Sequence, residues 1–196
     1  MKKVLEVKTK DKTIEVLLRH LKKSDKDGVW KNFNEALDEG IYLPVFTPVL
    51  SDFEKNSWYE SINKEHEICI VAEIPNFKSP YNIVGQCEIS NLEWEAATHV
   101  GSLGIIVSKE YRNIGIGRNL IDTAIRESKK LNNKEKIILS CFSTNERALE
   151  LYRKMGFKEV GVRKNQFYMD STYYDEVIME IFTEEYIKKA PSYDEN

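Results

Sequence analysis

The segment from Leu103 to Leu120 constrains the fold of this chain more than any other, because it joins an apolar strand to an amphipathic helix through two closely spaced glycines. The strand reads Leu-Gly-Ile-Ile-Val and ends at Val107, and the glycines are Gly115 and Gly117. Glycine lets a backbone turn tightly at a helix entry and approach a ligand closely. A chain with this segment is expected to pack a helix against a sheet.

The helix that follows Gly115 has the clearest pattern in the chain, with apolar residues at helical spacing and charged residues on the opposite side. The N–H groups of a first helical turn lack intrahelical partners and carry partial positive charge, so such an end binds phosphate. Arg112 and Arg118 can add charge-assisted contacts to that anion. The apolar positions are Ile116, Leu120, Ile121, Ala124, Ile125 and Leu131.

Three alternative interpretations of this loop can be compared with its residues and with its distance from the preceding strand. A turn that only starts a helix is the simplest alternative, because short glycine motifs are frequent. A dinucleotide fold would need a third glycine at Leu120, and its turn would follow the strand at once, whereas seven residues separate Val107 from Gly115. A Walker loop is excluded because no Gly-Lys-Ser/Thr follows. The loop can therefore cradle a pyrophosphate, but in neither of the two common nucleotide folds.

The remaining sequence predicts alternating groups of strands and helices. Adjacent strands together with two strand–helix crossovers indicate an α/β protein of the α+β type, with a mixed sheet and helices on both faces. Thr144 is expected to N-cap the last helix, and Gly156 to end it in the left-handed conformation. Strands are expected over residues 13–21, 68–74, 83–89, 99–107, 137–142, 157–169 and 173–182, and helices over 24–38, 51–63, from 115 onwards and 144–155.

Length and charge exclude several classes of protein. The 196 residues suit one domain, and a net charge of -3 offers no general attraction to nucleic acid or to an anionic membrane. The most apolar stretch, residues 40–50, is short and contains two prolines, so no transmembrane span is expected. Glu6 and Lys8 interrupt any signal-peptide core. A cytoplasmic protein without nucleic-acid or membrane partners is expected.

The cysteines support the same compartment. Cys69, Cys87 and Cys141 are odd in number and form no CxxC pair, and the chain has only three histidines. Neither a disulfide framework nor a metal site is therefore expected. All three lie in apolar runs, which predicts buried thiols in a reducing cytoplasm. A thiol relay through Cys87 or Cys141 is not favoured, because neither has an obvious histidine partner in the sequence.

Two linked motifs resemble those of the GNAT superfamily of N-acetyltransferases. The first is a strand followed by Arg/Gln-x-x-Gly-x-Gly/Ala and a helix, which stands here as Arg-Asn-Ile-Gly-Ile-Gly over residues 112–117. The second, over residues 143–157, carries Asn145, Ala148 and Tyr152. The resemblance covers roughly residues 10–182. It implies a single acetyltransferase domain over residues 1–196 with a polar tail from 183, and a twisted, mostly antiparallel sheet of about seven strands.

The resemblance also implies that acetyl-CoA is the co-substrate and that no metal is used. Family members splay the strand that ends at Val107 away from the next one, and the pantetheine arm lies in the gap. Asn145 would then bond the pantetheine arm, and Ala148 would pack beside it. Backbone groups of Ile105, Ile106 and Val107 would contact the acetyl and pantetheine parts. Backbone N–H groups of Arg112, Asn113, Ile114, Gly115, Ile116, Gly117 and Arg118 would hold the pyrophosphate.

Tyr152 matches the family tyrosine that often donates a proton to the departing CoA thiolate. A phenol is neutral at pH 7 and can hydrogen-bond to negative charge that develops on sulfur. The alternative is that Tyr152 only belongs to the apolar face of its helix. Its spacing from Asn145 favours the catalytic role.

Glu88 is the predicted general base, because its strand precedes the cofactor strand and its polar face could look into the cleft. A solvated strand glutamate is the alternative for this residue, and some family members use backbone carbonyls and water instead of one base. His99 is a weaker candidate, because a lone histidine is more often structural or exposed. The competing carboxylates are Glu73, Glu93 and Glu95.

The resemblance implies direct transfer, in a ternary complex, to a primary amine on a protein N-terminus, a lysine or a small molecule. The alternative is a catalytically inactive CoA-binding regulatory or interaction module, and the presence of Tyr152 argues against it. The acceptor amine is expected to be selected by residues 24–63 and by the hairpin around Asp170, without being identified. Dimers are common in the family, so a homodimer is one expected state.

Overall fold

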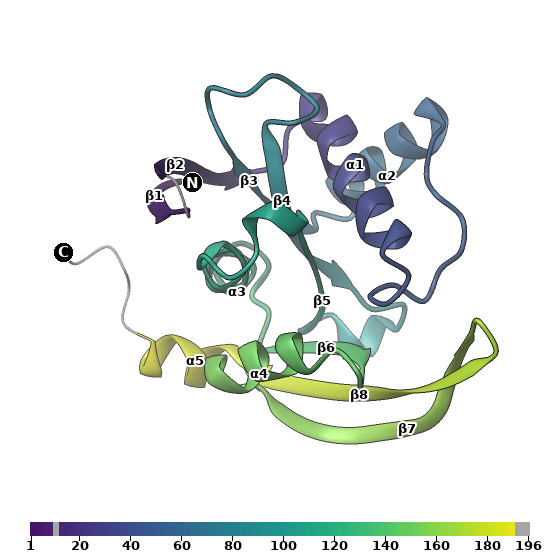
Figure 1. Ribbon diagram of the computed structural model, residues 1–196. Coiled ribbons are helices and arrows are strands. Elements are labelled where there is room, and N and C mark those ends of the chain that lie inside the picture. Colours follow the sequence, from purple (N-terminus) through teal and green to yellow (C-terminus); the bar gives the residue numbers. More distant parts are fainter. Residues whose placement is uncertain (10–11, 191–196) are drawn as a thin grey trace.

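The computed structural model describes residues 1–9 and 12–190, which form one eight-stranded mixed sheet with helices on both faces (Figure 1). The strand order is β1-β2-β3-β4-β5-β6-β8-β7. Every neighbouring pair is antiparallel except β5 with β6. The strands are β1 (Lys2–Lys8), β2 (Thr13–His20), β3 (Ile68–Glu73), β4 (Ile83–Asn91), β5 (Val100–Val107), β6 (Lys136–Phe142), β7 (Lys158–Met169) and β8 (Thr172–Phe182).

The helices divide between the two faces of the sheet. On one face, Val29 of α1 packs against Val71 and Ile83, with Trp58 of α2 beside them. On the other face, α3 and α4 share the main core with the strands. The predicted fold class, a mostly antiparallel mixed sheet with helices on both faces, is confirmed. The helices are α1 (Lys26–Asp38), α2 (Asp52–Lys64), α3 (Ile116–Asn132), α4 (Glu146–Met155) and α5 (Thr183–Lys189).

The apolar face of α3 forms the centre of the core, as its spacing predicted. Ile116, Leu120, Ile121 and Ile125 are completely buried. Each buried side chain of this size stabilises the fold by about 1.5–3 kcal/mol relative to exposure. Leu131 was also expected on this face, but it is 57% exposed in the last turn of the helix.

Both ends of the chain depart from the sequence-based expectation. Strand β1 was not predicted, which is why the sheet has eight strands and not about seven. Its inward positions, Lys3, Leu5 and Val7, alternate with exposed residues that include Val4, so the period-two pattern is masked. The segment after residue 182 begins with helix α5, where the Tyr186 hydroxyl donates to Asp122 at 2.8 Å. Residues 191–196 of the expected tail lie outside the described residues.

The N-cap of α4 also differs by one residue. Asn145, and not Thr144, occupies the cap, and its side chain accepts a hydrogen bond from the Ala148 N–H. Gly156 ends the helix at a φ of 96°, which confirms the predicted left-handed stop.

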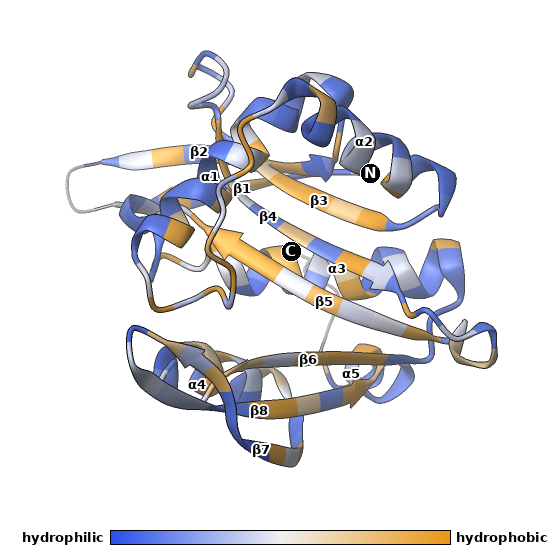
Figure 2. Cartoon of the chain, turned by 90° about the vertical axis from the view of Figure 1, so that its right-hand side faces the viewer, coloured by the Kyte–Doolittle hydropathy of each residue, from blue (hydrophilic) through white to orange (hydrophobic). Residues whose placement is uncertain are grey.

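Strands β5 and β6 pair only at one end. Val100–Ser102 pair with Lys136–Ile138, and beyond these residues the two strands diverge (Figure 2). Gly101 lies where they meet, and a Cβ there would come within 2.4 Å of Ile89 Cγ2. The buried Lys134 ammonium donates to the carbonyls of Thr98 and Val100 and so fixes the start of β5. Close packing around Gly101 and Lys134 therefore fixes the point from which β5 and β6 diverge.

Candidate active site

A cleft of about 500 Å³ lies where β5 and β6 diverge. Its walls come from β5, the loop that leads into α3, β6, α4, and the end of α1 with the loop that follows it. Because β5 pairs with β4 through Val107 but with β6 only through Ser102, residues 103–107 present backbone groups on the cleft side that no strand satisfies. The cleft thus combines an open strand edge with the N-terminal ends of two helices.

Most of the residues expected to bind the cofactor line this cleft. Ile114 and Ile116 do not, because their side chains pack against the core. Glu88 also lies outside the lining, one strand behind it. The expected residues that line the cleft are Ile105, Ile106, Val107, Arg112, Asn113, Gly115, Gly117, Arg118, Asn145, Ala148 and Tyr152.

The loop that leads into α3 owes its shape to two residues in the left-handed region. Asn113 has a φ of 66° and Gly115 a φ of 90°. Gly115 is the N-cap of α3 and supplies no side-chain cap, so the first-turn N–H groups are left for an external acceptor. Gly115, Gly117 and Arg118 line the cleft at this point. The geometry fits an anion held by backbone groups.

The Arg112 side chain was expected to contact the bound anion, but it is bonded to other parts of the protein. Its guanidinium forms a bidentate pair with Glu39 at 2.5 and 2.9 Å, and its Nε donates to the Val107 carbonyl at 2.8 Å. The same group lies over the ring of Tyr42, and the Arg112 hydrogen bond holds the pKa of Glu39 below its usual value. The side chain therefore links the end of α1 to the end of β5.

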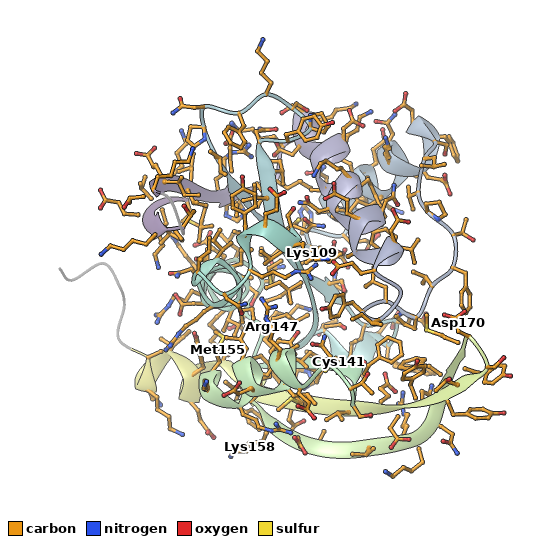
Figure 3. The ribbon with its side chains drawn as sticks, viewed as in Figure 1. Lys109, Cys141, Arg147, Met155, Lys158 and Asp170 are labelled. Carbon is orange, nitrogen blue, oxygen red and sulfur yellow. The ribbon has the colours of Figure 1, made fainter. Side chains whose placement is uncertain are left out.

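Three other cations line the cleft. They are Arg118 on α3 and Arg147 and Lys154 on α4. Arg147 lies between α3 and α4 (Figure 3). Neither Arg147 nor Lys154 was predicted from the sequence as a site residue. The signal for Arg147 was its place in the first turn of α4, two residues after Asn145, and it lines the same cleft as Gly115 and Gly117.

The Asn145 side chain uses its oxygen to cap α4, and its amide nitrogen can donate a hydrogen bond to a ligand. Its Oδ1 accepts from the Ala148 N–H at 3.3 Å as the cap of α4. Among the described residues, its Nδ2 has no hydrogen-bond partner. Since Asn145 lines the cleft, this amide can donate to a carbonyl of a bound ligand.

Tyr152 lies two turns along α4 from Asn145 and lines the same cleft. Its ring is buried, 6% exposed, and packs against Phe157 with ring centroids 5.8 Å apart. Burial raises the pKa of its hydroxyl well above the usual value, so the phenol is neutral at physiological pH. The hydroxyl makes no hydrogen bond to any described residue. It is free to donate to a ligand in the cleft.

Glu88 lies on β4 directly opposite Gly104, which is exposed on the open part of β5. A Cβ at Gly104 would meet nothing within 4 Å, so space is left beside this carboxyl group. Trp58 Nε1 donates to Glu88 Oε2 at 3.3 Å. Burial, with a smaller contribution from Glu67, raises the pKa of Glu88 to about 7. A carboxyl group with this pKa can exchange a proton near neutral pH.

The rival bases lie elsewhere. Glu73 is paired with Arg19 at 2.6 Å. Glu93, Glu95 and His99 are exposed on the connection that precedes β5, at the end opposite the open part of the strand. Among the predicted bases, Glu88 is therefore the one that lies next to the cleft.

The three cysteines are free thiols. Cys69 and Cys87 are buried as predicted, whereas Cys141 lines the cleft and is only half-buried; this partial burial raises its pKa to about 11. Burial also raises the pKa of Cys87 far above its usual value. Both are protonated at neutral pH and are poor nucleophiles. Among the described residues, no group of His, Cys, Asp and Glu side chains could hold a metal ion, and none of the helices there could cross a bilayer.

The opposite side of the cleft, on the face of α1 and α2, is mostly apolar. Phe142 packs against Phe167 and Tyr174, with ring centroids 4.7 and 5.5 Å apart. Phe167 and Tyr174 lie on the hairpin around Asp170, which was expected to help select the acceptor amine. The lining residues on this side are Ala36, Tyr42, Leu43, Pro44, Ser140, Phe142 and Phe167.

Comparison with known proteins shows which family the chain resembles. The model of the acetyltransferase (GNAT) family matches residues 36–157. An N-alpha-acetyltransferase from Sulfurisphaera tokodaii is 26% identical over 154 residues, which are 78% of this chain and 86% of that protein. A spermidine N(1)-acetyltransferase from Vibrio cholerae is 28% identical over 109 residues, which are 56% of this chain and 62% of that protein.

Solved structures agree on the fold. An N-acetyltransferase from Staphylococcus aureus Mu50 superposes with a TM-score of 0.78 at 22% identity, over 86% of this chain and 98% of that one. A phosphinothricin acetyltransferase from Sinorhizobium meliloti, solved in complex with acetyl-CoA, has a TM-score of 0.78 at 19% identity, over 91% and 94% of the two chains. The diverging strands, the glycine loop and the family match lead to one conclusion: the chain belongs to the acetyltransferase (GNAT) family.

Proposed function

We propose that this protein transfers the acetyl group of acetyl-CoA to a primary amine, by direct attack in a ternary complex within the cleft between β5 and β6. The observation that carries the proposal is the divergence of these strands after Ser102 and Ile138, beside a helix whose N-terminus is left uncapped by any side chain. The family match supports the reaction class.

The residues of the cleft fit a long polyanionic cofactor. The open edge of β5 at Ile105, Ile106 and Val107 offers backbone groups to an amide-bearing pantetheine arm, and Asn145 Nδ2 offers a donor on the other side. Backbone N–H groups from Asn113 to Arg118 would hold the pyrophosphate. Arg112 would contribute mainly by shaping this loop, because its side chain is committed to Glu39 and Val107. Arg118, Arg147 and Lys154 supply positive charge.

When bound, acetyl-CoA supplies a thioester carbonyl and a thiolate leaving group. Glu88 removes the proton from the attacking amine, through a water molecule in the space beside Gly104. A backbone N–H of the open β5 edge stabilises the oxyanion. Tyr152 donates its phenolic proton to the sulfur as the carbon–sulfur bond breaks. The products are the acetylated amine and the free CoA thiol, and no acyl-enzyme is formed on Cys141.

We place the whole chain in one acetyltransferase domain, since one sheet runs from β1 to β8. A reducing compartment such as the cytoplasm suits its free thiols. A homodimer stays a prediction.

The proposal is tested by measuring thiol release from acetyl-CoA across polyamines, amino acids, aminoglycosides and peptide N-termini. Acetyl-CoA alone should also raise the melting temperature of the protein at micromolar concentration, because a ligand of the native state stabilises it. A melting shift without turnover on any amine would instead favour a CoA-binding regulator. The absence of both would exclude the cleft as a CoA site.

A further inference from the structure

We infer that Ser140 is a further catalytic residue, which accepts a hydrogen bond from the attacking amine, and that Glu176 positions it for this task. This inference rests on the proposed acetyl transfer and adds a second contact to the amine that Glu88 deprotonates. Three observations carry it: the place of Ser140 on the open edge of β6, the missing side chain at Gly104, and the bond between Ser140 and a buried carboxylate.

Ser140 lies on the part of β6 that has separated from β5. The parallel pairing of the two strands ends at Ser102 with Ile138. The same offset, continued by two residues, sets Ser140 level with Gly104 across the opening. On its other side β6 stays paired with β8 (Figure 2). Ser140 is exposed and lines the cleft.

Glu88 and Ser140 lie on the same face of the sheet, on either side of Gly104. Glu88 is the partner of Gly104 in the antiparallel pairing of β4 with β5. Side chains of residues that are level in neighbouring strands point to the same face. This is the face that α2 covers, because Trp58 of α2 donates to Glu88. The proposed base and the Ser140 hydroxyl therefore flank the space above Gly104.

Gly104 lacks the usual structural reasons for a glycine in a strand. Its φ is not positive, unlike that of Gly115, and the pairing of β4 with β5 runs past it without a bulge. A Cβ there would meet no described atom within 4 Å, whereas a Cβ at Gly101 would come within 2.4 Å of Ile89. Glycine inside a strand weakens it and often marks a place where a ligand approaches the backbone. The space therefore suits the reacting end of the acceptor.

A buried carboxylate fixes the direction of the Ser140 hydroxyl. Ser140 Oγ donates to Glu176 Oε1 at 2.6 Å, and Arg163 donates to the other carboxylate oxygen at 2.9 Å. Glu176 is only 7% exposed. A hydroxyl has one hydrogen and two acceptor lone pairs. Because the hydrogen is committed to Glu176, the Ser140 oxygen can only accept a hydrogen bond from a ligand in the cleft.

An acceptor at this point suits the attacking nitrogen. A neutral primary amine has a lone pair, which attacks the thioester carbon, and two hydrogens. One hydrogen bonds to the water beside Glu88 and the other to Ser140 Oγ, which orients the lone pair. The nitrogen becomes positive as the carbon–nitrogen bond forms, so both hydrogen bonds strengthen in the transition state. The proton still leaves to Glu88, and Ser140 keeps its own hydrogen and forms no covalent bond.

This arrangement distinguishes primary from secondary amines. A neutral secondary amine has a single hydrogen, which the water beside Glu88 takes. It therefore gains nothing from Ser140. The preference of the protein for a primary amine should accordingly depend on the Ser140 hydroxyl, which a role of Ser140 in folding alone would not explain.

The test measures kcat/KM for a primary amine and for the same amine methylated on its reacting nitrogen. The amine is the member of the panel of polyamines, amino acids, aminoglycosides and peptide N-termini with the highest kcat/KM. Ser140→Ala should lower kcat/KM for the primary amine about tenfold, the scale of one lost hydrogen bond, and that for the methylated amine less than about threefold. KM for acetyl-CoA should stay unchanged.

Ser90→Ala is the matched control. Ser90 lies on the same face of the sheet as Glu88, but it pairs with Ser102 at the closed end of the strands and is outside the cleft lining. The substitution should change none of these values.

A double-mutant cycle tests the role of Glu176. Glu176→Gln keeps the shape of the side chain, but its amide can also donate to Ser140, so the hydroxyl hydrogen is no longer held in one direction. It should lower kcat/KM for the primary amine about threefold when Ser140 is present and have no further effect in the Ser140→Ala protein. Equal effects in both backgrounds, with unchanged melting temperatures, would mean that Glu176 does not position Ser140.

The outcomes separate this inference from the proposed function. If Ser140→Ala leaves kcat/KM for the primary amine unchanged, or lowers the values for both amines equally, the inference is wrong and acetyl transfer stands. No turnover of any amine by the native protein, together with no melting shift on adding acetyl-CoA, would remove the proposed function itself.

Discussion

Tyr152 and Glu88 have opposite tasks in the proposed reaction, and burial suits each of them to its task. Burial raises the pKa of the Tyr152 hydroxyl, so it keeps its proton until a thiolate develops beside it. Burial also raises the pKa of Glu88 to about 7, which makes it a stronger base than an exposed carboxylate. The same physical effect therefore prepares the acid on α4 and the base on β4.

Replacing Tyr152 with Phe is expected to lower kcat about 100-fold, the scale on which a positioned acid contributes. KM for acetyl-CoA should change little, because the ring still packs against Phe157. The measurement is steady-state thiol release. Tyr186→Phe is the matched control: it removes another mostly buried hydroxyl, bonded to Asp122 and outside the cleft lining, and should cost about 1 kcal/mol of stability without changing kcat. Full turnover by the Tyr152 variant would end its assignment as the acid.

Replacing Glu88 with Gln is expected to remove the pH dependence of kcat/KM, which in the native protein should rise as the pH passes about 7 and the base loses its proton. Stability gives a second readout. A pKa raised on folding stabilises the native state most below the unfolded pKa, near 4.3, and this contribution is lost as the pH rises through about 7. The variant should therefore gain melting temperature relative to the native protein at pH 8. An unchanged pH profile would exclude Glu88 as the base.

At the scale of elements, the cleft depends on how tightly β5 and β6 meet at their closed end. Gly101→Ala would place a Cβ 2.4 Å from Ile89 Cγ2 and 3.1 Å from Ile137 Cδ1. We expect it to destabilise the protein by about 1–3 kcal/mol, as overpacked cores do. Gly161→Ala, where a Cβ meets nothing within 4 Å, is the control and should be close to neutral in urea unfolding. Equal stability of both variants would contradict this account of the strand junction.

Arg112 links the end of α1 to the end of β5, two elements that are far apart in the sequence. Arg112→Lys cannot keep the bidentate pair with Glu39 and the bond to the Val107 carbonyl at the same time, so it should cost about 2 kcal/mol of unfolding free energy. Glu39→Gln should cost less. A double-mutant cycle should show coupling of about 1 kcal/mol or more. Additive effects would mean that the ion pair contributes nothing to holding α1 against β5.

The elements that the sequence predicted well are those with a strong local pattern. The α3 helix, the apolar strand β3 and the left-handed stop at Gly156 follow from spacing and backbone preference alone. Strand β1 was missed because a charged residue, Lys3, points inward and an apolar residue, Val4, is exposed, so its sequence does not alternate between polar and apolar residues. Leu131 was misplaced because the last turn of α3 extends past the part of the sheet that covers the rest of the helix. The partner of Arg112 could not be predicted, since Glu39 is 73 residues away in sequence and only the folded sheet places α1 beside the loop.

At the scale of the whole molecule, the proposed reaction would have its two substrates reach the cleft from opposite faces of the sheet. The loop that leads into α3 lies with α4 on one face, and α1 with its following loop lies on the other. The cleft between the diverging β5 and β6 is lined by residues from both faces of the sheet. An amine that enters from the α1 face can meet a thioester that enters from the α3 face. A covalent relay through the protein is unnecessary in this geometry.

The most direct test of this account is residue-resolved amide hydrogen exchange with and without saturating acetyl-CoA. The open edge of β5, residues 103–107, and the entry of α3, residues 115–119, should exchange more slowly when acetyl-CoA is bound, because their N–H groups become hydrogen-bonded or shielded. Strands β1 and β2, at the other edge of the sheet, should be unchanged. Unchanged exchange in both of these segments at saturating acetyl-CoA would contradict the claim that the divergence of β5 and β6 forms the acetyl-CoA site.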